Sequence, residues 1–235
     1  MTALSHLPPT FADTCAGLRA LACYVIAPAR KAVTERIGLR STPGGFGTPP
    51  FGDRDRRVRV RAERLIVDEG GAELASAPIT TLTDAAALVG IPLSSDPGVG
   101  HDIPAFAPDT PLAVDPVASL ALGAWYEFAV SVIDGVRPAL EAAGTVSEAQ
   151  LWPEHFDLAA DHQPATGRRV NLGFSPGDGF HPEPYVYLGP WDRTGLDDPF
   201  WNAPFGAYLS YDSLLAADDA QSAAREFLTA GLALL

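Results

Sequence analysis

The stretch from Gln150 to Trp191, QLWPEHFDLAADHQPATGRRVNLGFSPGDGFHPEPYVYLGPW, decides the fold. It holds short runs of strand-forming residues separated by clusters of proline, glycine and aspartate, which is typical of strands joined by turns. Connections this short favour antiparallel pairing. Three of the five histidines and two of the four tryptophans also lie here. The stretch therefore predicts an antiparallel sheet and the first place to look for a functional site.

The sequence on either side of this stretch predicts flanking helices. Apolar residues recur there at helical spacing, and residues that cap helices well, such as Asp115, precede the apolar runs. Before the central stretch, the sequence predicts a helix at about 13–37 that is interrupted near Pro28, a hairpin of strands at 57–68 and 72–79, a short helix at 81–89 and a helix from 115 to beyond 133. After it, the sequence predicts a strand at 207–211 and a C-terminal helix. The expected fold class is α+β, an antiparallel sheet with flanking helices, in two similar helix-hairpin-helix halves.

The chain length of 235 residues fits one large domain or two small lobes. Residues 93–112 are rich in proline, glycine, serine and aspartate, which indicates a linker. We therefore expect a single compact domain over 1–235, with lobes at 12–92 and 113–235 as the alternative.

Charge narrows the classes of partner. The formal net charge is −13 and the isoelectric point is about 4.6. An acidic protein is repelled by nucleic acid and by anionic membrane surfaces, so we expect neither as a partner. An unidentified small molecule is the expected partner, and the oligomeric state stays open.

Cysteine spacing and the N-terminal sequence bear on localisation. Cys15 and Cys23 would lie roughly 12 Å apart on one helix, too far for a disulfide. Reduced thiols fit a cytoplasmic protein. The first residues, MTALSHLPPTFADT, have no basic segment followed by an apolar one, and no apolar run approaches the ~20 residues of a membrane span. We expect a cytoplasmic, bacterial protein.

Polar side chains in the central stretch predict a ligand site. If Leu151 to Ala159 is one strand, its alternation places His155 and Asp157 on the same face. His181 and Glu183 repeat that spacing at the start of the following strand. With Asn171 they would line a polar cleft on the sheet. Our first hypothesis is that this cleft binds a small molecule without catalysis, and no cofactor is expected.

The same residues support a second hypothesis. Imidazole and carboxylate groups both suit divalent ions such as Zn²⁺ or Mn²⁺. His155, Asp157, His181 and Glu183 would then be the metal ligands of a hydrolase or isomerase. The alternative is that these side chains hydrogen-bond one another and only hold the sheet together.

A third hypothesis concerns the segment Ser41 to Asp53, STPGGFGTPPFGD. It lacks the lysine of a phosphate-binding loop, so we expect an extended surface loop whose two phenylalanines pack down. In a purely structural or partner-binding protein, Phe46 and Phe51 would form an interface instead.

Residues 173–177, GFSPG, match the G-x-S-x-G signature of serine hydrolases. The residue after that serine must donate its backbone N–H to the oxyanion hole, and here it is Pro176, which has none. We therefore interpret residues 175–179, SPGDG, as a turn.

Three segments together carry a family resemblance: Leu151–Ala159 (LWPEHFDLA), Asn171–Asp178 (NLGFSPGD) and Pro182–Tyr187 (PEPYVY). The combination resembles a bacterial, actinobacterial-type family of unknown function with Trp-Pro-His-His-Phe-Asp-Leu-Ala, Gly-Phe-x-x-Gly-Asp and Pro-x-x-Tyr-x-Tyr motifs. The resemblance covers about residues 105–235. Glu154 stands where the family pattern has its first histidine. The family has no known activity, so the resemblance implies a domain and no function.

Overall fold

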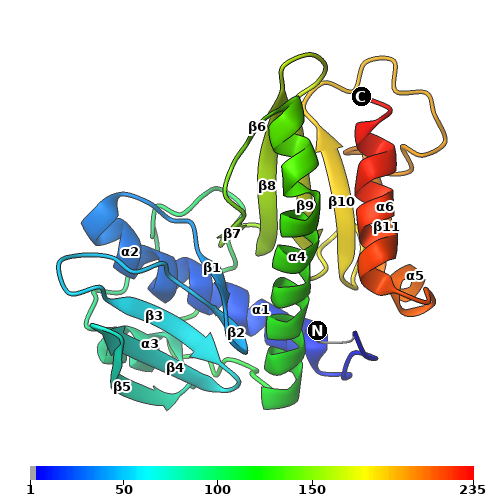
Figure 1. Ribbon diagram of the computed structural model, residues 1–235. Helices are drawn as coiled ribbons and strands as arrows, with labels where there is room; N and C mark the ends of the chain where they lie inside the picture. The colour runs from blue at the N-terminus through cyan, green and yellow to red at the C-terminus, as the bar shows by residue number, and fades with distance from the viewer. Residues whose placement is uncertain (1–3) are drawn as a thin grey trace. The chain divides into compact units, whose positions relative to one another are not determined.

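The computed structural model describes residues 4–235, and the contacts divide the chain into two units, each described here by itself. The N-terminal unit comprises Leu7–Tyr126 and Leu151–Phe156. The C-terminal unit comprises Glu127–Gln150 and Asp157–Leu235, together with residues 4–6. The structure contains two antiparallel sheets and several helices, which confirms the α+β class (Figure 1). The expectation of a single domain, or of lobes at 12–92 and 113–235, stays a prediction.

The N-terminal unit begins with the helical segment expected at 13–37. Helix α1, Phe11–Leu21, passes through a π-helical turn at Ala22–Ile26 into α2, Ala27–Thr34. The interruption expected near Pro28 is confirmed. Pro28 has no backbone N–H, so one helical hydrogen bond is missing where the π-helical turn passes into α2.

The first sheet has the order β1-β2-β3-β4-β5. Its strands are β1 (Arg40–Thr42), β2 (Gly45–Gly47), β3 (Arg57–Arg61), β4 (Arg64–Glu69) and β5 (Ala72–Pro78). The single strand expected at 57–68 is therefore wrong, because the chain reverses between Arg61 and Arg64. Ala62 makes this turn with a φ of 50°. Alanine rarely adopts that conformation, so the sequence gives no turn signal here.

The glycine- and proline-rich segment 41–53 is more ordered than expected. Gly45 and Gly47 belong to β2 and pack so closely on β3 that a Cβ atom at either position would overlap its backbone. Phe46 and Phe51 are buried, as expected, and leave 1% and 5% of their surface exposed. They present no free surface to a partner.

Two helices follow in the order expected. In α3, Leu82–Val89, the Thr81 side chain caps the N-terminus and Gly90 ends the helix with a φ of 74°. Residues 93–112 form irregular structure within the N-terminal unit. Helix α4, Pro116–Ala143, begins where Asp115 accepts hydrogen bonds from the N–H groups of Val117 and Ala118.

Within residues 4–235, α4 is the one helix long and apolar enough to cross a membrane. Of its most apolar window, 56% is buried inside the protein. Helices buried in the core of a protein can have the same length and composition.

The second sheet has the order β11-β10-β9-β8-β6. Its strands are β6 (Gly144–Val146), β8 (Asp157–Pro164), β9 (Val170–Ser175), β10 (Tyr185–Pro190) and β11 (Ala207–Ser210), with β7 (Gln150–Trp152) pairing on β8 off this path. Two helices close the chain, α5 (Tyr211–Leu215) and α6 (Ala220–Leu232). Within the C-terminal unit, α4 and α6 cover the same face of this sheet (Figure 1).

Packing on that face follows the alternation of the strands. Phe174 on β9 meets Phe128 on α4 with ring centroids 6.0 Å apart. Gly231 on α6 lies so close to Leu188 on β10 that a Cβ atom would overlap it. Residues with the opposite parity therefore face away from both helices.

The strand expected at 151–159 is wrong. Residues 153–156 form a turn between β7 and β8, closed by a hydrogen bond of 2.7 Å from Phe156 N–H to the Trp152 carbonyl. Phe156 has a φ of 58° and is fully buried. The alternation that would place His155 and Asp157 on one strand face does not exist, because the backbone reverses between them.

Candidate functional site

Two residues expected in the ligand site, Asp157 and Asn171, lie on the helix-free face of the second sheet. Asp157 opens β8 and Asn171 belongs to β9, and Tyr185 and Tyr187 on β10 share this face. Gly173 pairs with Tyr187 in the register, and a Cβ atom there would lie 2.5 Å from the tyrosine ring. The missing side chain of Gly173 thus leaves room for the Tyr187 ring against β9.

Two tyrosine–aspartate pairs lie on this face. The Tyr187 hydroxyl donates to Asp157, and the Tyr185 hydroxyl donates to Asp178 at 2.6 Å. Burial, followed by the neighbouring carboxylates, raises the pKa of both tyrosines well above the usual value. Both phenols therefore stay protonated donors, and the pairs brace the sheet.

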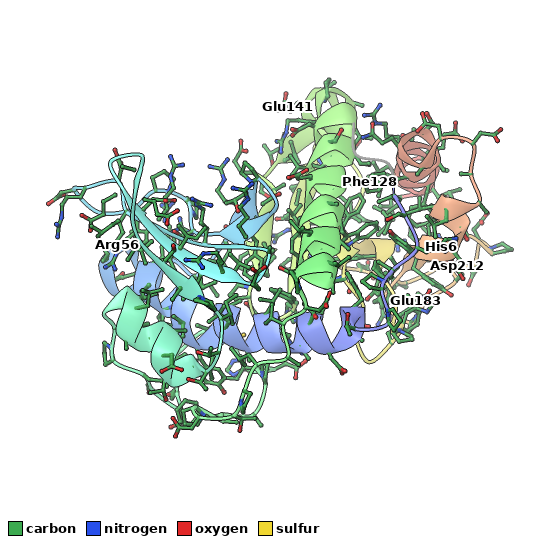
Figure 2. The ribbon with its side chains drawn as sticks, turned by 90° about the horizontal axis from the view of Figure 1, so that it is seen from below. His6, Arg56, Phe128, Glu141, Glu183 and Asp212 are labelled. Atoms are coloured by element: carbon green, nitrogen blue, oxygen red, sulfur yellow. The ribbon has the colours of Figure 1, made fainter. Side chains whose placement is uncertain are left out.

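The loop before β10 positions His181 and Glu183. The chain turns after Ser175, where Gly177 N–H donates to the Ser175 hydroxyl, and it bends again where Asp178 accepts hydrogen bonds from the backbone N–H groups of Phe180 and His181. The His181 ring packs 5.5 Å from that of Tyr208, and its buried Nε2 has no hydrogen-bond partner among residues 4–235. Glu183 is exposed, on the side of the C-terminal unit that also carries His6 and Asp212 (Figure 2).

Asn171 belongs to a different surface cluster on the same face. Its side-chain oxygen accepts a hydrogen bond of 3.1 Å from the Trp191 indole N–H. The Arg169 guanidinium lies 3.6 Å from the Trp191 ring centroid and pairs with Asp161. Trp191 is 62% exposed, so an aromatic surface here is open to solvent.

The expected metal ligands are distributed over different elements. His155 lies exposed in the turn between β7 and β8, within the N-terminal unit. Asp157, His181 and Glu183 belong to the C-terminal unit. Among residues 4–235, no three histidine, cysteine, aspartate or glutamate side chains form a group that could hold a metal ion. The metal site stays a prediction.

A pocket of about 240 Å³ lies in the C-terminal unit, away from these residues. The last turns of α4, the end of β8 with the turn that follows it, and the last turns of α6 form its wall. All three meet at one end of the unit (Figure 1). The buried part of the lining, called the floor here, includes Val136, Leu140 and His162. The exposed part, called the rim, includes Ala139, Ala143 and Thr229.

The packing of α4 against α6 explains why the pocket forms at this end. Farther down the pair, the Gln221 amide donates to the Ser131 hydroxyl at 3.0 Å and the Arg225 guanidinium donates to the Ser131 carbonyl. These contacts connect the helices. Beyond Val136, the small side chains of Ala139 and Ala143 face Thr229 on α6 and leave the volume unfilled.

His162 is the buried polar group of the floor, with 3% of its surface exposed. Strand alternation directs it to the helix-covered side with Leu158 and Ala160. Its Nδ1 lies 3.0 Å from the carbonyl oxygen of Thr145 on β6. A carbonyl oxygen only accepts, so Nδ1 carries the proton, and in the corresponding imidazole tautomer Nε2 is the acceptor.

Sequence reasoning missed His162 and the pocket. The signal was present in β8, where an imidazole occupies a position that alternation assigns to an apolar residue. The rest of the lining comes from helix ends remote in sequence, and no motif marks them.

Comparisons with known proteins identify no relative: no family model, no curated protein and no solved structure matches the chain. The family resemblance of residues 105–235 stays a prediction.

Proposed function

We propose that the protein binds a small organic molecule in the pocket between α4, α6 and the end of β8. The observation that carries this proposal is a mostly apolar pocket around one buried imidazole. Ligand sites are typically concave and apolar, with a few fixed polar groups that orient the ligand. An apolar cavity of about 150 Å³ is known to hold benzene. A volume of about 240 Å³ therefore suits one substituted ring or a short branched chain.

A fragment screen tests this proposal. Binding to the full chain is followed by ligand-observed NMR, and hits are retested on two α4 variants. Ala139→Phe places a large side chain on the rim, while Ala142→Phe places the same side chain on an exposed residue outside the lining. We expect hits that Ala139→Phe weakens at least tenfold and Ala142→Phe leaves unchanged. A screen without hits, or hits equally insensitive to both variants, contradicts the proposal.

A second candidate is a surface site on the helix-free face, which shares Asn171 with the ligand site expected from the sequence. The observation in its favour is the exposed Trp191 ring, held beside Asn171 and Arg169. An open aromatic face with amide and charged groups around it suits a polar ring-shaped ligand. If Trp191→Ala abolishes the binding of such a ligand and Ala139→Phe leaves its affinity unchanged, the result favours this face over the pocket.

The hydrolase or isomerase hypothesis requires a bound divalent ion. Elemental analysis of the purified protein, after growth with added zinc and manganese, tests it. About one ion per chain, together with a lower melting temperature after chelation, supports a metalloenzyme. A metal content far below one ion per chain would contradict the hydrolase or isomerase hypothesis.

A further inference from the structure

We infer that the ligand of the pocket is a small apolar alcohol or phenol whose hydroxyl donates a hydrogen bond to Nε2 of His162. This inference rests on the proposed function and adds the chemical class of the ligand. Two observations support it: the orientation of the His162 side chain and the apolar residues that surround this side chain.

The hydrogen bond to β6 sets the chemistry of the imidazole. Because Nδ1 donates to the Thr145 carbonyl at 3.0 Å, the ring is fixed in orientation and in tautomer. Nε2 then holds a lone pair and makes no hydrogen bond to any of residues 4–235. A ligand in the pocket meets an acceptor, so it must supply a donor.

The rest of the floor makes that donor selective. Val136 and Leu140 have no hydrogen-bonding side-chain atoms, so they cannot satisfy Nε2 once a ligand has displaced water. A ligand without a donor leaves a buried acceptor unpaired, which costs binding free energy. A hydroxyl group pairs it and leaves the remaining ligand surface to apolar contacts.

The one cation of the lining does not favour an anionic ligand. Arg168 lines the pocket, but its guanidinium donates to the carbonyl oxygen of Asp192 at 3.0 Å. A ligand carboxylate would place a charge beside the apolar floor. A neutral hydroxyl avoids that cost.

Three probes of nearly equal shape test the inference on the full chain: 4-ethylphenol, its methyl ether 4-ethylanisole, and ethylbenzene. Only the phenol has a donor. We expect the phenol to bind about fivefold to tenfold more tightly than the other two, which is the range that one neutral hydrogen bond supplies. The long-range ¹⁵N NMR spectrum of His162 should shift at Nε2 with the phenol and stay unchanged with the ether.

Two variants separate the anchor from the fold. In His162→Asn, the side-chain N–H can replace Nδ1–H toward Thr145, but the acceptor at the Nε2 position is lost. In His162→Gln, an amide oxygen can reach that position. We expect the phenol preference to fall below twofold in His162→Asn and to return in part in His162→Gln.

Each outcome decides one claim. Equal binding of all three probes at the pocket overturns the hydroxyl anchor and leaves the proposed function standing. A phenol preference that survives His162→Asn also overturns the anchor. If none of the three probes binds, but other fragments bind the pocket and Ala139→Phe blocks them, the inferred ligand class is wrong. If nothing binds at the pocket, the proposed function fails as well.

Discussion

The Nδ1 atom of His162 lies 3.0 Å from the carbonyl oxygen of Thr145, so strand β6 fixes an imidazole of β8 under the helix pair. This polar group is part of the sheet framework, whereas the rim opposite it belongs to helix ends. The sheet therefore holds the floor of the pocket in place, and the floor selects ligands by the hydrogen-bond donor that they present to His162.

Replacing His162 by phenylalanine should destabilise the C-terminal unit by about 1 kcal/mol, because the Thr145 carbonyl loses its donor. His162→Asn should lose less, since the amide N–H can restore that bond. Urea denaturation measures both. Equal loss in the two variants would show that packing, and not the hydrogen bond to Thr145, holds the imidazole.

Adding a methyl group to Gly231 should destabilise the protein by about 1 to 3 kcal/mol, because the new Cβ would overlap Leu188 and the Phe200 ring. Gly17→Ala is the control on another helix, α1. Its Cβ would lie 3.4 Å from the nearest atom, the backbone nitrogen of Ala113, and alanine favours helix by about 1 kcal/mol. Thermal unfolding should therefore lower the melting temperature of the first variant and not that of the second.

Stability should fall as the pH rises above about 10, where tyrosines of the unfolded chain ionise. The pKa values of Tyr185 and Tyr187 are raised by burial, so the folded protein keeps their protons longer. Their contribution is complete below the unfolded pKa and is lost as the pH climbs toward the folded one. The buried thiol of Cys23, with a pKa of about 12, acts in the same direction.

The Tyr187→Phe variant isolates the tyrosine contribution. Its free energy of unfolding should depend less steeply on alkaline pH than that of the wild type, because one titrating group is gone. Identical slopes in urea titrations across this range would mean that Tyr187 is not protected from ionisation in the folded state.

Removing the His155 imidazole should change stability by less than about 0.5 kcal/mol, since the side chain is exposed in a turn. Asp157→Ala should cost about 1 to 3 kcal/mol, because Asp157 is buried and accepts a hydrogen bond from Tyr187. The double variant should behave as the sum of the two. A large loss of unfolding free energy from His155→Ala alone would show that His155 interacts with its surroundings as the sequence predicted for the pair with Asp157.

Much of the fold could be predicted because local signals and packing agree. The Asp115-Pro116 helix start, Gly90 at the end of α3 and the turn around Asp178 all behave as their side-chain chemistry requires. The two wrong strands share one physical cause. Ala62 and Phe156 adopt left-handed backbone conformations that their residue types rarely take, and tertiary packing overrides the local preference.

The candidate site was harder to predict, for two reasons. The turn at Phe156 separates His155 from the strand that carries Asp157, so a pattern read as alternation has no structural counterpart. The pocket is formed by the ends of α4, α6 and β8, which are far apart in sequence. Only His162, out of place on an apolar strand face, could have indicated it.

The central claim is that a small molecule binds in the pocket, and a methyl NMR titration of the full chain tests it most directly. Leucine and valine methyl groups are labelled, and 4-ethylphenol is added. We expect chemical-shift changes at Val136, Leu140 and Leu232, which Ala139→Phe abolishes and Ala142→Phe retains. Unchanged pocket methyl signals in the presence of every fragment tested would contradict it.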